Sequence, residues 1–151
     1  MSGPSRRELA RKVYDRLRGS WLTVYFGEIH GTVPTLITGG KPDPSGRVRS
    51  YAVVYPGAGT PNGDVDLGDS SADLDWSVQV TVAAGFTDDV LDAADFVHDR
   101  LHRWRPTGLT GVHADGLIPP PGFDPGPVRV DRDLKPHRFW LPLQYRLTAT
   151  T

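Results

Sequence analysis

The chain has 151 residues, a formal net charge of −1 and no cysteine. This length predicts a single domain with one core, and the near-neutral charge argues against a protein whose main task is to grip a nucleic-acid backbone. The lack of cysteine excludes disulfides, thiol chemistry and cysteine-ligated zinc. Because no signal peptide or membrane-spanning run is apparent, we expect a soluble protein made in the cytoplasm, without a membrane partner.

The first half of the chain predicts one helix and three strands. Ser5 stands three residues before Glu8, the spacing of a capping box, and Leu9, Val13 and Leu17 then repeat along one side of a helix over residues 5–18. Two strands are predicted over residues 21–26 and 48–55, because both stretches are rich in β-branched and aromatic residues. The clearest strand covers residues 74–83, in which apolar and polar residues alternate. This alternation predicts one buried face and one polar face.

A second helix is expected over residues 88–104, capped by Thr87. Aspartates crowd its first half and arginines its second half, as the helix dipole favours. One side of this helix carries an apolar stripe that should pack on the strand at 74–83: Val90, Ala94, Val97, Leu101 and Trp104.

The remaining chain is a Pro/Gly-rich segment at residues 106–136, with a short strand near 128–130, followed by a last strand at 138–149. Pro142 cannot donate to a strand ladder, so this last strand is expected at a sheet edge or with a bulge. The fold class predicted is α+β: a single domain with a largely antiparallel sheet of four to five strands, two helices packed on one face, and long loops.

The segment at residues 53–76, VVYPGAGTPNGDVDLGDSSADLDW, poses the main functional question, because glycines there precede five aspartates. A phosphate-binding loop requires a helix N-terminus directly after its glycines, whereas a strand follows here. A calcium loop from Asp64 to Asp75 would need a ligand at its fifth position and Gly at its sixth, but Gly68 and Asp69 stand in the reverse order and no Glu closes the loop. We therefore expect a solvated acidic loop without a cofactor.

The stretch HDRLH places His98 and His102 on one side of the second helix, the spacing of zinc-binding histidine pairs. Asp99 stands where a zinc protease has its catalytic glutamate, and His113, the next histidine, lies beyond Pro106. Without a credible third ligand we expect no catalytic or other metal. The sequence leaves open a set of Ser, His and Asp residues that only the fold would bring together, although it contains no nucleophile elbow.

Three stretches carry a resemblance to a known family: YAVVYPGAGTP at 51–61, DLDWSVQVTVAAG running into DVLDAADFVHDRL at 73–101, and VRVDRDLKPHRFWLPLQYRLTA at 128–149. Together with the order of elements, they make nearly the whole chain resemble the tail terminator (tail-to-head joining) proteins of long-tailed, non-contractile bacteriophages that infect actinobacteria.

The resemblance implies a structural virion protein at the head-proximal end of the phage tail, with neither enzymatic activity nor a cofactor. It implies a homohexameric ring that caps the tail tube protein, ends its polymerisation and binds a head–tail connector or head completion protein, while DNA passes through the lumen without specific binding. Two alternatives stay open: another head–tail connector or tail completion protein, and a small α+β enzyme or ligand-binding module.

The long loop at residues 56–75 is the predicted assembly site, because long loops on a rigid sheet usually serve binding and this one exceeds common hairpin loops. Its first part is predicted to contact a neighbouring subunit or the tube through Pro56, Gly57, Gly59, Thr60, Pro61, Asn62 and Gly63. Its glycines are expected to let it adapt to that neighbour. Asp64, Asp66 and Asp69 are assigned either to arginines of an adjacent subunit or of the tube protein, or to the lumen, where an acidic wall would not retain DNA.

Overall fold

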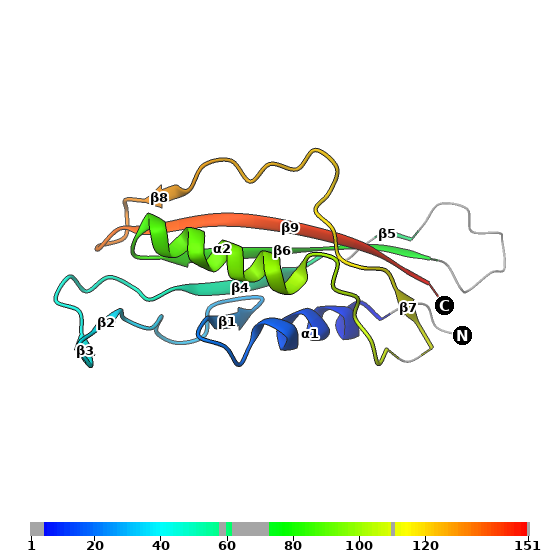
Figure 1. Ribbon diagram of the computed structural model, residues 1–151, viewed down its shortest axis with the longest axis horizontal. Coiled ribbons are helices and arrows are strands. Elements are labelled where there is room, and N and C mark those ends of the chain that lie inside the picture. The colour runs from blue at the N-terminus through cyan, green and yellow to red at the C-terminus, as the bar shows by residue number, and fades with distance from the viewer. Residues whose placement is uncertain (1–4, 58–59, 62–72, 110, 151) are drawn as a thin grey trace.

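The computed structural model describes residues 5–57, 60–61, 73–109 and 111–150, which form a twisted sheet with two helices on one side (Figure 1). The main path of the sheet has five strands in the order β1 (Thr23–Phe26), β4 (Tyr51–Pro56), β6 (Leu74–Ala84), β9 (Arg138–Thr150) and β7 (His113–Ala114). Two short strands extend it: β5 (Thr60–Pro61) pairs with β6, and β8 (Arg129–Asp131) pairs with β9. The helices are α1 (Arg6–Leu17) and α2 (Thr87–Leu101). The predicted α+β class is confirmed.

Every strand pair in this sheet is antiparallel except β1 with β4, which run parallel. A parallel pair requires a crossover connection, and here residues 27–50 supply it with a separate two-stranded sheet, β2 (Ile37–Thr38) and β3 (Lys41–Pro42), instead of a helix. The strands predicted at 21–26, 48–55 and 128–130 are present as β1, β4 and β8, with boundaries shifted by at most three residues.

The main core lies between the sheet and the two helices. Strand β6 supplies every second residue from Leu74 to Ala84, as its alternation predicts, and α1 supplies Leu9, Val13 and Leu17. The predicted packing of the α2 stripe on this strand is confirmed, since Val90, Val97 and Leu101 are fully buried in the same cluster and Trp104 packs against it.

The two helices differ in how they begin. The hydroxyl Oγ of Ser5 accepts a hydrogen bond from the backbone N–H of Glu8 at 3.2 Å, so the predicted cap of α1 is confirmed. The predicted cap of α2 is wrong: Phe86 holds the N-cap position without a side-chain hydrogen bond, and Thr87 is already the first helical residue.

Helix α2 also ends earlier than the predicted residue 104. Arg103 adopts a left-handed backbone conformation with φ of 63°, and its N–H donates to the Leu117 carbonyl at 2.6 Å. This long-range hydrogen bond takes the donor that a continued helix would need, so the chain turns away after Leu101. The residue pattern of the helix could not predict this hydrogen bond, because its acceptor, Leu117, lies beyond the helix in the Pro/Gly-rich segment.

The prediction that Pro142 marks an edge strand is only partly correct. Strand β9 has neighbours on both sides, yet residues 141–145 have no strand partner on their outer edge within the described chain. Arg146 exchanges two hydrogen bonds with Ile118 on that outer edge, at 2.7 and 3.0 Å. Residues two apart in a strand face the same way, so the missing N–H of Pro142 faces the unpaired outer edge and leaves the ladder with β6 intact.

Candidate functional site

The face of the sheet opposite the helices lies outside the main core. The odd-numbered residues of β6 and the even-numbered residues of β9 point to this face, because the helix-covered core takes the others. One end of the face is partly covered by the β1–β4 connection, where Val33 and Val48 pack against Tyr51, Val53 and Ala83. We call this surface the open face.

A groove of about 600 Å³ occupies the open face next to this small cluster. Tyr51, Val53 and Ala83 form its floor, and its walls come from two separate connections. Ile29 stands on the connection after β1, Asp131 ends β8, and Leu134 stands on the turn between β8 and β9. The other lining residues are Tyr55, Gln79, Thr81, Arg138 and Trp140. We call this hollow the aromatic groove.

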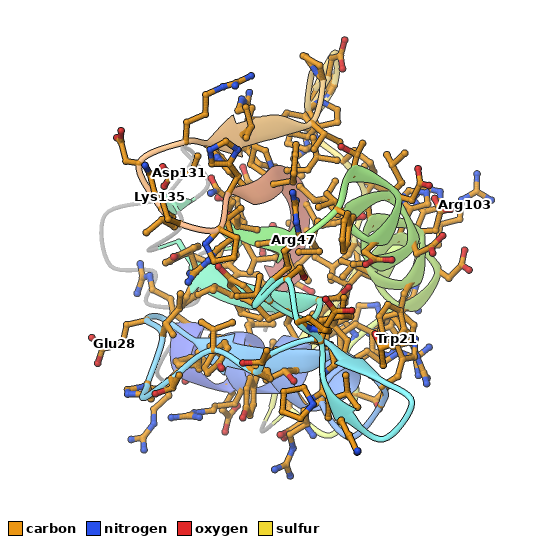
Figure 2. All side chains as sticks on the ribbon, turned by 90° about the vertical axis from the view of Figure 1, so that its left-hand side faces the viewer. Trp21, Glu28, Arg47, Arg103, Asp131 and Lys135 are labelled. Carbon is orange, nitrogen blue, oxygen red and sulfur yellow. The ribbon has the colours of Figure 1, made fainter. Side chains whose placement is uncertain are left out.

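Figure 2 displays the two walls from the end of the sheet. Asp131 and Lys135 lie above the open face and Glu28 lies below it, all three on the side away from α2. Leu134 and Ile29, which neighbour these labelled residues in sequence, are more than one-third exposed, as is Tyr55. The groove is therefore rimmed by exposed apolar side chains on both sides, in addition to its buried floor.

Arg138 is the cation that lines the aromatic groove. Its Nη1 donates to the Tyr51 hydroxyl at 3.2 Å, and its guanidinium carbon lies 5.9 Å from the centroid of the Tyr51 ring. Its buried Nε has no hydrogen-bond partner within the described residues. Tyr25 packs edge-on against Tyr51, and burial, followed by the electrostatic influence of Tyr51, raises the pKa of the Tyr25 hydroxyl. The groove thus holds a tyrosine hydroxyl that accepts from Arg138, and an arginine whose Nε lacks a partner within the described residues.

A second hollow, of about 540 Å³, lies at the other end of β6 and β9 and is polar. It is lined on the sheet by Asp75, Ser77, Arg146 and Thr148, and the Thr148 hydroxyl donates to Oδ1 of Asp75 at 2.9 Å. Because Asp75 already has this partner across the strand pair, the hollow has the character of a solvated sheet surface.

The predicted assembly loop is only partly within the described residues. Strands β4 and β6 pair as a hairpin, and β5 continues the pairing, with Thr60 opposite Asp75 and Pro61 opposite Leu74. Pro56 and Gly57 therefore belong to the sheet margin. Gly59, Asn62, Gly63, Asp64, Asp66 and Asp69 lie outside the described residues, so their predicted roles stay predictions.

Glycine at position 57 is explained by packing within the sheet, and not by the predicted ability of the loop to adapt to a neighbour. Its N–H donates to the Ser77 carbonyl at 2.9 Å, and its own carbonyl accepts from Nε1 of Trp76 at 2.9 Å. A Cβ at this position would approach the Ser77 carbonyl oxygen to 2.8 Å. Glycine is required here by close packing against β6, because no side chain fits.

The two histidines of the predicted zinc-type spacing lie at the end of α2, His98 within the helix and His102 at its C-cap. The rings of His98 and His102 stack with centroids 4.6 Å apart and planes 20° from parallel, and Nδ1 of His98 lies 3.0 Å from the Tyr145 hydroxyl. Within the described residues, no three His, Cys, Asp or Glu side chains gather closely enough to hold a metal ion. Burial lowers the pKa of His102, with smaller contributions from His98 and Arg103, and burial raises the pKa of Tyr145 to about 12.

The sequence matches no protein-family model, and no curated protein matches it. In the described part of the chain, neither helix has the length and apolar character needed to cross a membrane. The aromatic groove was missed by sequence reasoning, although a signal was present. Strand β4 is apolar at consecutive positions from Tyr51 to Val54, which indicates burial on both faces, whereas β6 alternates.

Proposed function

We propose that the protein is a tail terminator of a long-tailed, non-contractile bacteriophage. Six copies form a ring in the virion, at the head-proximal end of the tail. The ring caps the tail tube, stops its polymerisation and binds the head–tail connector, and DNA passes through its lumen. The resemblance of three stretches of sequence to this family supplies the starting point.

The observation that carries the proposal is that the two faces of the sheet are covered differently. Two helices cover one face, whereas the other presents an aromatic groove with exposed Ile29, Tyr55 and Leu134 at its rim. Aromatic side chains are enriched at the centre of protein interfaces. We assign this face to contact with a second copy of the chain.

If the groove of one copy binds a different surface of the neighbouring copy, a ring is favoured over a two-fold dimer. Such a contact is heterologous, and it either closes into a ring or extends into a filament. A closed ring suits a terminator, since a filament of the same chain would compete with the tube that it has to cap.

The test is native mass spectrometry combined with negative-stain imaging of the purified protein over a range of concentrations. We expect six-membered particles with a central hole. In the presence of tail tube protein, the particles should sit at tube ends and hold tube length constant as more tube protein is added.

A matched pair of variants connects this result to the open face. Tyr55→Ser removes a 41% exposed ring from the groove rim and should reduce ring formation, whereas Leu91→Ser removes a 47% exposed side chain from α2 and should not. A protein that stays monomeric under all conditions, with or without tube protein, would contradict the proposal and favour the enzyme or ligand-binding alternative.

A further inference from the structure

The segment at residues 118–127, IPPPGFDPGP, lies largely at the surface between two points where the chain pairs with β9. We call it the proline segment. It runs along the outer edge of β9 between two anchors, the Ile118–Arg146 bridge on one side and strand β8 on the other (Figure 1). Two local bonds shape it: the Phe123 N–H donates to the Pro120 carbonyl at 3.0 Å, and the Gly126 N–H donates to Oδ1 of Asp124 at 2.8 Å.

Because of this construction, the proline segment should lose little conformational entropy when it binds. Its five prolines fix φ in the unbound state, and its anchored ends remove much of the freedom that binding would otherwise have to restrict. Pro121, Asp124 and Pro127 are exposed. Proline-rich segments characteristically dock in grooves lined by aromatic side chains, because their rings stack on flat apolar surfaces and little conformational entropy is lost.

The aromatic groove has the matching chemistry. Tyr51, Tyr55 and Trp140 line it, Ile29 and Leu134 rim it, and its volume of about 600 Å³ lies within the range of roughly 300–1,000 Å³ typical of binding pockets. Arg138 is the cation among the residues that line the groove, and its Nη1 donates to the Tyr51 hydroxyl at 3.2 Å. Asp124 is the only acidic residue of the proline segment, and its Oδ1 already holds the local turn. A carboxylate and a guanidinium form strong charge-assisted hydrogen bonds.

We propose that the aromatic groove binds the proline segment of a second copy of this chain, with the segment's prolines against the tyrosine and tryptophan rings and Asp124 at Arg138. Lys135, on the turn after β8, lies on the same side of the sheet as Asp131 and adds a positive charge there (Figure 2). It offsets the negative charge that Asp131 would present to the incoming carboxylate.

A chain does not fill its own groove in this way. None of the residues that line the groove comes from the proline segment, which follows the outer edge of β9 while the groove lies on the open face. Groove and segment are thus separate surfaces, so each copy offers one of each, and the contact is head-to-tail. This inference rests on the proposed function, because it names the contact that closes the proposed ring.

The first experiment measures the contact without requiring a ring. A fluorescently labelled peptide covering residues 118–128 is titrated with the full-length protein, and its anisotropy is recorded. We expect saturable binding with a Kd of about 1 mM or lower. Binding should weaken at least about tenfold for the peptide with Asp124→Arg and for the protein with Tyr55→Ser and Arg138→Gln together.

The matched control is the protein with Leu91→Ser and Arg100→Gln. Leu91 is as exposed as Tyr55, and the Arg100 guanidinium lies 5.4 Å from the Phe96 ring much as Arg138 lies near Tyr51, but both residues are on α2, away from the groove. This control should bind the peptide as the wild type does. Circular dichroism and thermal melting establish that both double variants are folded before binding is compared.

The second experiment mixes two defective chains. One carries the groove changes Tyr55→Ser and Arg138→Gln, and the other carries Pro120→Ser, Pro121→Ser and Asp124→Arg in the proline segment. Each chain alone should fail to form rings. Because their mixture retains one intact groove and one intact segment, it should form dimers and no larger assembly by native mass spectrometry.

The outcomes separate this inference from the proposed function. Absence of peptide binding, or binding unchanged by the groove substitutions, would overturn the inference. Wild-type rings that persist in both defective chains would also overturn it while leaving the ring function in place. A wild type that never forms rings but binds the peptide in the groove would uphold the inference and contradict the function.

Discussion

The two faces of the central sheet are built from alternate residues of the same strands, yet they have opposite fates. On β6, Val78, Val80 and Val82 are buried beneath α1 and α2, while Ser77, Gln79 and Thr81 face outward with at most partial cover. The helix-covered face holds the fold together through apolar burial. The open face keeps only a small cluster under the β1–β4 connection and leaves the aromatic groove beside it. The helix-covered face therefore supplies stability, and we assign recognition to the open face.

The sharpest way to break this contrast is to place the same charge on adjacent residues of β6. Val80→Asp would bury a carboxylate in the helix-covered core, where the native side chain is 0% exposed, and should cost several kcal/mol of unfolding free energy. Thr81→Asp, one residue further on the open face, should cost about 1 kcal/mol or less. Thermal or urea denaturation of both variants measures the difference. Similar losses for the two would show that the faces are not distinguished as described.

The margin of the sheet gives the next largest effect. Gly57→Ala should destabilise the protein by about 1–3 kcal/mol, because the added Cβ would press on the backbone carbonyl of Ser77. The neighbouring exposed Pro56 provides the control, since Pro56→Ala adds nothing to that contact. Urea denaturation of both variants is the measurement. If Gly57→Ala were as stable as the wild type, Gly57 would be free to serve the adaptable role predicted from the sequence.

Periodic segments were the part of this structure that sequence reasoning could reach. The alternation of β6 and the stripes of α1 and α2 each record a local repeat, so the parts of the core that these three elements supply were predictable. The end of α2 was not, because it depends on a hydrogen bond from Arg103 to the distant Leu117. The parallel pairing of β1 with β4 was missed for the same reason.

The candidate site was less accessible to sequence reasoning than the fold. Its rim comes from Ile29, Leu134 and Tyr55, which are far apart in the chain and share no motif. Only the uninterrupted apolar run of β4 hinted that the second face was used. The glycines and aspartates of the 56–75 loop attracted attention because they are close together in sequence. Distance in the chain, however, does not report which side chains meet in space.

A polar seam within the helix-covered side provides the third test. Tyr145 is buried, and its hydroxyl lies 3.0 Å from Nδ1 of His98. Tyr145→Phe removes this hydrogen bond and should cost about 0.5–1.5 kcal/mol at neutral pH. The fold also favours the protonated phenol, since burial raises the pKa of Tyr145 to about 12 from its ordinary 10. The wild type should therefore lose stability as pH rises above about 10, and this component of the loss should be absent from Tyr145→Phe.

The smallest expected effect concerns His102 at the same seam. Burial, reinforced by His98 and then by Arg103, lowers the pKa of His102 below its unfolded value of 6.5. Its buried Nδ1 has no hydrogen-bond partner within the described residues, so the folded state prefers the neutral ring. The unfolded chain therefore binds a proton more readily, and the stability that His102 contributes is present above pH 6.5 and falls as pH drops towards the folded pKa.

The melting temperature should decline between pH of about 7.5 and 5.5 by more in the wild type than in His102→Gln. His30→Gln, which replaces an exposed histidine beside Glu28, should retain the wild-type decline. Equal declines in the wild type and His102→Gln would mean that a charged His102 is as stable in the folded protein as in solvent. The contrast between the helix-covered face and the open face would then not extend to this side of α2.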